Sequence, residues 1–146
     1  MTTVDPARLY PVRVATAHPV HENARVERFT ELLHSLASSP QNVHELGQLM
    51  LASHLSYNAC GLGSDGTDRL VAMVADARAA HGLYGAKITG GGSGGTVAIL
   101  AANDAEPAVR ALASRYAEET GRRAEVFAGS GPGMGQRGVV QRFVTW

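Results

Sequence analysis

The chain is poor in several features that mark particular classes of protein. It has one cysteine, Cys60, which excludes an internal disulfide and suits the reducing cytoplasm. No apolar run approaches the roughly 18 residues that span a bilayer, and the first residues lack a signal-peptide core. The net charge is zero, so nothing draws the chain toward nucleic acid or a membrane surface. We therefore expect a cytoplasmic protein that forms one domain of 146 residues and binds neither nucleic acid nor membranes.

Glycine, in contrast, is abundant, and six consecutive positions carry almost no side chain. These positions are Gly90, Gly91, Gly92, Ser93, Gly94 and Gly95. They separate two short runs of strand composition. A backbone this bare suits positive φ angles and close approach to another group, so several N–H groups can face one anion such as a phosphate. A flexible hairpin turn between the two strands is the alternative.

Two well-known glycine-rich loops do not fit this stretch. Gly90, Gly92 and Gly95 match the spacing G-x-G-x-x-G, but this dinucleotide fingerprint has to open a helix. Here residues 96–100 follow, and their composition is that of a strand. A Walker A loop needs lysine and then serine or threonine directly after its last glycine, whereas Lys87, the one lysine, precedes the glycines. Both loop types are excluded.

A second loop ends at Ser64, Asp65 and Gly66, just before a predicted helix. Asp65 or Thr67 can cap this helix. The free N–H groups and partial positive charge of a helix N-terminus suit a phosphate or a sugar oxygen. An ordinary capped helix start is the alternative.

Other groupings point less clearly to chemistry. Cys60 and His54 are residue types that form nucleophile and base in some enzymes, but a single cysteine is more often a small buried apolar residue. The six histidines show neither H-E-x-x-H nor C-x-x-C spacing. We therefore assign no catalytic residue and no metal site to this chain.

The order of the predicted elements indicates an α+β fold with a mainly antiparallel sheet packed against helices. Prolines at positions 6, 11 and 19 predict an extended segment over residues 1–21. Apolar spacing predicts helices over 22–37 and 43–57, with Gly47 permitting close packing, and a third helix from the second loop to about residue 80. A strand over 96–101 and a helix capped by Asn103 or Asp104 and stopped by Gly121 follow. Residues 124–128 and 139–144 read as strands joined by a glycine-rich connector.

Four stretches of the sequence resemble the GHMP kinases, the superfamily of galactokinase, homoserine kinase and mevalonate kinase, and they follow one another along the chain in the family's order. Residues 85–95, G-A-K-I-T-G-G-G-S-G-G, are similar to that family's third motif. Residues 45–56 resemble the G-x-L-M-x-x-S-H-x-S helix of the sugar kinases, residues 56–70 the L-arabinokinase branch close to galactokinase, and residues 18–26 the stretch that opens this half. The resemblance covers nearly the whole chain. It implies a ferredoxin-like carboxyl-terminal domain over residues 22–146, with residues 1–21 joining it to another domain.

In that family ATP lies between two domains and phosphate passes to a substrate hydroxyl, the anomeric one in the galactokinase and arabinokinase branches. The resemblance places residues 90–95 next to the nucleotide phosphates and Ser64, Asp65 and Gly66 near the interdomain cleft. It also implies structural hydrogen bonds for His54. Mg²⁺ would come with ATP and be held largely by the phosphates and the other domain.

The family's amino-terminal domain carries a P-x-x-x-G-L-S-S-S-A phosphate loop, and nothing in this sequence resembles it. We therefore expect the carboxyl-terminal domain of a kinase for L-arabinose or a galactose-like sugar, inactive alone, with a GHMP amino-terminal domain as its partner. The face that would meet that partner should be apolar and exposed, which favours self-association into a homo-oligomer. A free-standing ligand- or subunit-binding module of the same fold is the alternative.

Overall fold

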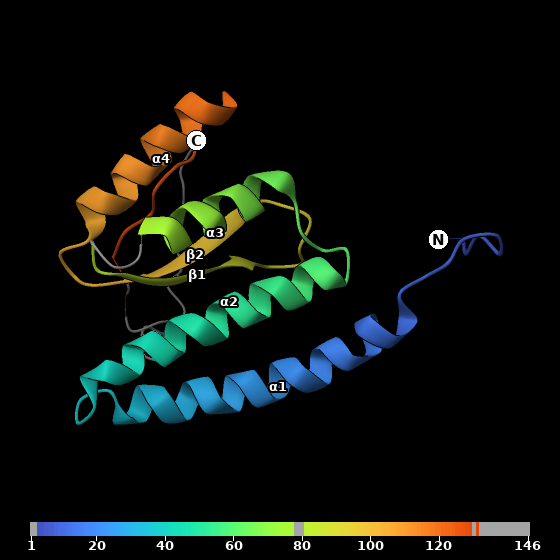
Figure 1. Cartoon of the computed structure of the whole chain (residues 1–146), viewed down its shortest axis with the longest axis horizontal. Helices are drawn as coiled ribbons and strands as arrows, with labels where there is room; N and C mark the ends of the chain where they lie inside the picture. Colours follow the sequence, from blue (N-terminus) through green and yellow to red (C-terminus); the bar gives the residue numbers. More distant parts are fainter. Residues whose placement is uncertain (1–2, 78–80, 130, 132–146) are drawn as a thin grey trace, which may run out of the picture.

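The structure, a computed structural model, describes residues 3–77, 81–129 and 131. Helix α1 spans Val12–Ser35, and the short 3-10 helix η1, Pro40–Asn42, leads into α2, Val43–Ala59. Helix α3 spans Asp65–Ala77, strands β1 and β2 span Leu83–Thr89 and Thr96–Ala101, and α4 spans Glu106–Thr120. Figure 1 shows α1 and α2 stacked on one side of the strands and α3 and α4 on the other. This arrangement confirms the α+β class.

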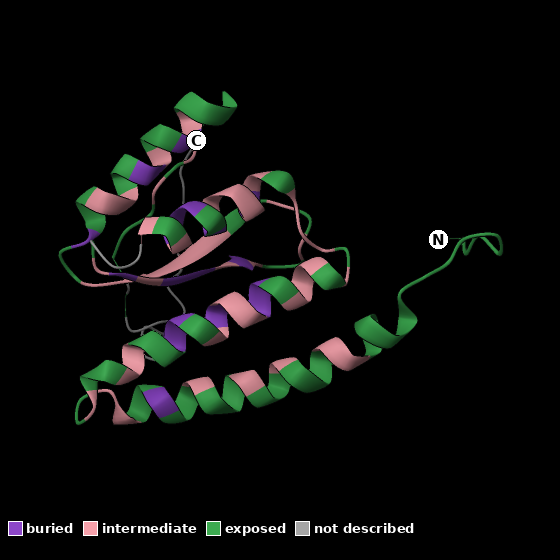
Figure 2. Cartoon of the chain, viewed as in Figure 1, coloured by how far each residue is buried: buried purple, intermediate pink, exposed green. Residues whose placement is uncertain are grey.

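The sheet is an antiparallel pair, and it brackets the glycine-rich stretch. Ala86 lies opposite Ile99 and Thr89 opposite Thr96, with an irregularity between Leu83 and Gly85. Leu83 and Ala86 are buried in one cluster with side chains of α3 and α4. Figure 2 shows buried residues in purple on β1 and on both of these helices. The α3 and α4 members of this core are Val71, Met73, Val74, Leu112 and Tyr116. The core therefore holds β1 firmly just before the glycines begin.

On its other side β1 contacts α2 almost backbone to backbone, at Gly47 and Gly85. A Cβ atom added to Gly47 would overlap the carbonyl oxygen of Tyr84, and one added to Gly85 would lie 2.6 Å from the carbonyl oxygen of Gly47. The close packing predicted for Gly47 is confirmed. Leu46 and Ile88, both fully buried, flank this contact. Glycine at both positions therefore sets the distance between helix and strand.

Helix α1 begins at Val12, so the extended backbone predicted over residues 1–21 is wrong from residue 12 onward. Pro11 precedes the helix at its N-cap, where proline needs no N–H partner, and Pro19 lies inside it. An interior proline loses one helical hydrogen bond, but its ring is on the exposed side here. Two contacts hold this part of α1 against α2 and its C-cap residue: the His18 ring bonds Ser56, and the Cys60 thiol donates to the Val14 carbonyl.

Replacing Pro19 by alanine is expected to raise the free energy of unfolding by about 1–3 kcal/mol, because alanine restores the missing hydrogen bond. Thermal unfolding followed by circular dichroism measures the change. The matched control is Pro11→Ala, which lies before the first helical turn and should shift the midpoint much less. A lower midpoint for Pro19→Ala would show that the proline is favourable where it stands.

The carboxyl-terminal part of the described chain differs from the prediction in two places. Helix α4 has Ala105 at its N-cap, not Asn103 or Asp104, and Ala105 is buried in the core. It ends at Gly121 with a left-handed φ of 70°, as predicted. Residues 124–128 form no strand, because β1 and β2 pair only with each other among the described residues. The strand predicted over 139–144 lies outside the described residues, as does nearly all of the connector before it.

None of the helices that the structure describes combines the length and the hydropathy needed to cross a lipid bilayer.

Candidate functional site

The glycine loop, residues 90–95, turns the chain from β1 into β2 through left-handed backbone. The φ angles are 78° at Gly90, 88° at Gly92, 116° at Gly94 and 102° at Gly95, and Ser93 also has a positive φ of 63°. Such angles are strained for residues with a Cβ atom, which explains why glycine fills four of these five positions. The loop leads into a strand, in agreement with the exclusion of the dinucleotide fingerprint.

The chain segment after α2 lies directly against the glycine loop. The Ser93 N–H donates to the Leu62 carbonyl over 2.5 Å, and the Tyr57 hydroxyl donates to the Gly90 carbonyl over 3.3 Å. A Cβ atom at Gly92 would lie 2.7 Å from the Cβ of Leu62, and one at Gly94 would lie 3.4 Å from the Ser64 hydroxyl oxygen. The structure thus brings together the two loops that the sequence singled out.

The hydrogen bonds of the loop leave some backbone donors open. Ser93 donates to Leu62, and residues 90 and 91 form a hydrogen-bonded turn, whereas the N–H groups of Gly91 and Gly94 have no hydrogen-bond partner within the described part of the chain. Gly91 is exposed, and Gly92 and Gly94 are half-buried. Backbone donors without partners in one glycine-rich loop are suited to bind an anion.

Ser64, Asp65 and Gly66 lie at the start of α3 but face different neighbours. The Ser64 hydroxyl accepts from the Thr67 N–H over 3.5 Å and is 2.9 Å from the Thr67 hydroxyl, so Ser64 caps α3 in place of Asp65 or Thr67. Asp65 is exposed. Gly66 faces α4, because a Cβ atom there would lie 2.8 Å from the Tyr116 hydroxyl. Ser64 is the member of this group that approaches the glycine loop.

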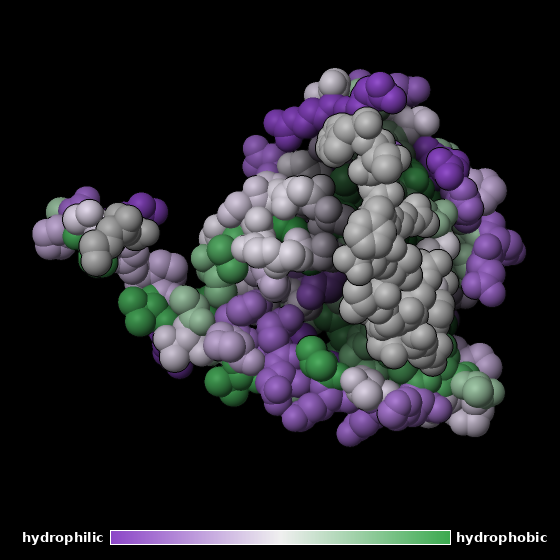
Figure 3. Space-filling model, turned by 180° about the vertical axis from the view of Figure 1, so that it is seen from behind, coloured by the Kyte–Doolittle hydropathy of each residue, from purple (hydrophilic) through white to green (hydrophobic). Residues whose placement is uncertain are grey.

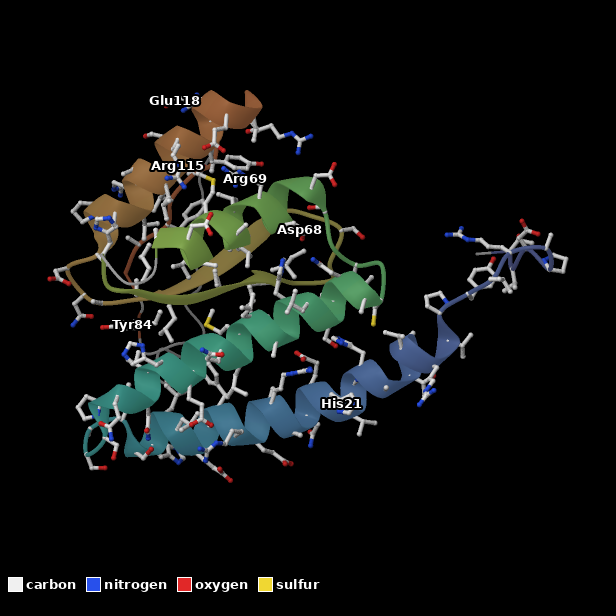
Figure 4. The ribbon with its side chains drawn as sticks, in the orientation of Figure 1. His21, Asp68, Arg69, Tyr84, Arg115 and Glu118 are labelled. Carbon is white, nitrogen blue, oxygen red and sulfur yellow. The ribbon has the colours of Figure 1, made fainter. Side chains whose placement is uncertain are left out.

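His54, buried in α2, connects β1 to α3. Its Nδ1 accepts the Ile88 N–H over 3.3 Å, so the ring proton is on Nε2, which lies 3.2 Å from Oδ1 of Asp68. Figure 4 labels Asp68 in the first turn of α3. Burial lowers the pKa of His54 and outweighs the opposing effect of Asp68, so the ring is neutral at pH 7. These contacts are the structural ones that the resemblance implied.

The environment of His54 also excludes its use as a base for Cys60. Both of its ring nitrogens face other groups, Ile88 and Asp68. The Cys60 thiol faces the Val14 carbonyl of α1, at 3.8 Å. The two side chains therefore do not form a nucleophile–base pair.

Because the pKa of His54 is lowered by folding, the unfolded chain binds this proton more readily than the folded chain. Its contribution to stability should be complete above the ordinary pKa of 6.5 and should be lost as the pH falls below it, toward the lower folded pKa. Urea unfolding at pH 7.5 and pH 5 measures this loss. His54→Gln should reduce the difference in free energy of unfolding between the two pH values, whereas His21→Gln, at an exposed position on α1 (Figure 4), should leave it as in the wild type. The same difference in His54→Gln as in the wild type would contradict the lowered pKa of His54.

A group of polar side chains joins α1, α2 and β1 beside the glycine loop; we call it the polar seam. Its members are His18, Glu22, Ser53, Ser56, Tyr57 and Lys87. Glu22 accepts from Ser53 over 2.5 Å and from Arg25. Burial alone would raise the pKa of Glu22, but these hydrogen bonds and the nearby positive charges of Arg25 and Lys87 lower it, so the group is a carboxylate.

Lys87 takes part in the polar seam. Its Nζ lies 3.9 Å from Oε2 of Glu22 and 5.4 Å from the centre of the Tyr57 ring. The charge of the chain's one lysine is thus balanced by α1. Any attraction of the glycine loop for anions must come mainly from its backbone.

Sequence reasoning did not identify Tyr57 and Leu62 as neighbours of the glycine loop. The apolar ring of Tyr57 fits the inner face of a helix and so does not reveal the contact of its hydroxyl, and a backbone carbonyl such as that of Leu62 leaves no mark in the sequence. The Tyr57 hydroxyl, close to the end of an otherwise apolar stripe, is the one signal that pointed to a polar partner.

Comparisons with known proteins show which family the chain is similar to. A sequence model described as "GHMP kinases C terminal" matches residues 29–118. The chain is 44% identical to the L-arabinokinase of Arabidopsis thaliana over 97% of its own length and 14% of that protein. It is 37% identical to a galactokinase of Chloroflexus aurantiacus over 73% of its length and 26% of the relative. For a galactokinase of Bacillus subtilis these values are 31%, 75% and 27%.

The chain thus spans much less than half of each of these relatives, while its own length is mostly covered by each match. The match of the family model includes α2, the glycine loop and α4, the same elements that build the candidate site. This chain belongs to the GHMP kinases, and its residues 29–118 are the carboxyl-terminal domain of that family.

Proposed function

We propose that this chain is the carboxyl-terminal part of an ATP-dependent sugar kinase, and that its glycine loop lies next to the nucleotide phosphates. The reaction is phosphoryl transfer to a monosaccharide hydroxyl, the anomeric one of L-arabinose or a galactose-like sugar. The observation that carries the proposal is the loop itself, whose N–H groups at Gly91 and Gly94 have no partner in the described part of the chain. The names of the relatives support the choice of sugar.

The contribution of this chain is binding and positioning. Phosphoryl transfer depends mainly on aligning the reactants and neutralising the phosphate charge. The open N–H groups of the loop stabilise negative charge without a basic side chain, and the Ser64 hydroxyl lies beside Gly94 as a further polar group. We assign no acid, base or nucleophile to these residues. The single cysteine is consistent with a cytoplasmic enzyme.

Mg²⁺ would reach this site bound to ATP. Among the described residues there is no group of three or more His, Cys, Asp or Glu side chains that could hold a metal ion. Asp65 and Asp68 lie in the first turn of α3, close to Ser64, but they belong to one helical turn. The ATP phosphates and the amino-terminal domain are therefore the expected ligands.

We infer that the amino-terminal domain of the same kinase covers the outer side of α1 and the segment before it. Several large apolar side chains are exposed there: Leu9 is 96% exposed, Val20 68%, Val12 66% and Val26 61%. In Figure 3 green apolar residues lie on the part of α1 nearest the N-terminus. Apolar area of this kind on a soluble domain marks an interaction surface.

If this surface is uncovered in the isolated chain, the chain should self-associate. Light scattering over a range of concentrations measures the mass, and Val20→Glu together with Val26→Glu should return the protein to a monomer. The control is Glu27→Gln, an exposed polar change on the same helix. A monomer at every concentration would count against the exposed apolar surface as an interface.

A complementation experiment tests the kinase assignment. This chain is mixed with a separately expressed GHMP amino-terminal domain, ATP, Mg²⁺ and either L-arabinose or galactose. We expect sugar phosphate from the mixture and none from either part alone. Absence of both association and turnover would favour a free-standing binding module, and turnover by this chain alone would show that it carries chemistry we have not assigned.

A further inference from the structure

We propose that Tyr57 is a positioning residue for the glycine loop, holding it in the conformation that presents its open N–H groups. The proposal rests on the proposed function for its effect on the nucleotide, but its structural part stands on contacts within this chain.

Two hydrogen bonds attach the glycine loop to the end of α2 and the segment that follows. The Tyr57 hydroxyl bonds the Gly90 carbonyl, at the start of the loop, and the Leu62 carbonyl accepts from the Ser93 N–H. Gly91, whose N–H group is open, and Gly92 lie between these attachments. The two bonds therefore fix the part of the loop with the greatest backbone freedom.

The ring of Tyr57 is itself held by two side chains from separate elements. The His18 ring of α1 meets it edge to face at 4.9 Å between ring centres, and the Lys87 ammonium of β1 lies 5.4 Å from its centre. His18 is fixed in turn by a 2.7 Å hydrogen bond to Ser56 and Lys87 by Glu22. The position of the Tyr57 hydroxyl is therefore set by α1, α2 and β1 together.

The loop needs such an external support because of its own composition. Glycine has more accessible backbone conformations than any other residue, so a loop with five of them loses much entropy when it is ordered around a ligand. A side-chain hydrogen bond that orders it beforehand lowers this cost and strengthens binding. The Tyr57 hydroxyl supplies that bond.

Hydrogen exchange of the loop amides tests the structural part. Tyr57→Phe keeps the ring and its contacts with His18 and Lys87 and removes only the hydroxyl. The matched control is Tyr84→Phe at the opposite end of β1, where the ring contacts His44 and no partner is seen for the hydroxyl among the described residues. We expect the Ser93 amide to exchange about 2- to 10-fold faster in Tyr57→Phe, the range for loss of one net hydrogen bond, and to be unchanged in Tyr84→Phe. Equal exchange in the two variants would overturn the proposal.

The kinetic part uses the reconstituted mixture of the two domains. Tyr57→Phe should raise KM for ATP by about the same 2- to 10-fold, with a smaller change in kcat. Its thermal midpoint should fall by no more than the few degrees that one hydrogen bond accounts for, whereas a general loss of structure would lower the midpoint much further. Faster exchange with an unchanged KM would show that the loop is positioned for something other than the nucleotide. If the wild-type mixture has no activity, the proposed function fails, and the exchange experiment still decides whether Tyr57 positions the loop.

Discussion

Replacing Gly47 by alanine is expected to lower the free energy of unfolding by about 3 kcal/mol or more, the largest stability change predicted for this chain. The added Cβ atom would overlap the Tyr84 carbonyl, so either α2 or β1 has to move. Such a shift would also disturb the bond from the Ile88 N–H to His54, further along the same contact. Urea unfolding followed by circular dichroism measures the loss.

The sign of this effect is what makes the experiment decisive. In an exposed helix, glycine to alanine stabilises by about 1 kcal/mol, the opposite direction. Gly91→Ala is the matched control, because a Cβ atom there meets no other atom within 4 Å and the residue needs no positive φ. A stabilised Gly47→Ala would mean that helix and strand do not touch at this point.

Replacing Gly92 by alanine is expected to reduce kcat/KM for ATP about 100-fold in the reconstituted kinase, the effect of moving a positioning group by about 1 Å. The φ of 88° disfavours any side chain, and the Cβ atom would lie 2.8 Å from the Leu62 carbonyl oxygen that accepts the Ser93 N–H. The loop would have to leave this segment, and its open N–H groups would move with it.

The free energy of unfolding of the Gly92→Ala chain should change little, since the loop is at the surface and outside the core. The loss of kcat/KM would then not result from unfolding. Gly91→Ala again serves for comparison: its Cβ atom meets no other atom within 4 Å and its φ is not positive, so its activity should fall less than that of Gly92→Ala. If kcat/KM for ATP fell equally in the two variants, the contact between Gly92 and Leu62 would not be the cause of the loss.

The described helices α2, α3 and α4 followed closely from their apolar spacing, and β2 from its composition, because these patterns are local. Helix α1 did not. Its three nearby prolines indicate extended backbone, and the helix forms from Val12 because it packs on α2, through contacts such as that of His18 with Ser56. Residues 124–128 show the converse: they have strand composition, but a strand requires a partner, and none pairs with them among the described residues.

The salt bridge between α3 and α4 likewise could not be anticipated. Arg69 of α3, labelled in Figure 4, contacts Glu119 of α4, a residue far away in sequence. Arg115 contacts the same Glu119, but this pair lies within α4 at the i,i+4 spacing that a helix brings together. Charged residues on predicted helix surfaces have many candidate partners, and the packing of the helices selects among them.

The sequence by itself determined that residues 90–95 form a left-handed loop between strands and that Gly47 permits close packing, because only glycine meets those steric demands. Tertiary structure decided what those glycines face: Gly85 opposite Gly47, Leu62 opposite Gly92, and the Tyr57 hydroxyl at the Gly90 carbonyl. A missing side chain reveals in the sequence that something comes close, but the identity of that neighbour depends on contacts between segments distant along the chain.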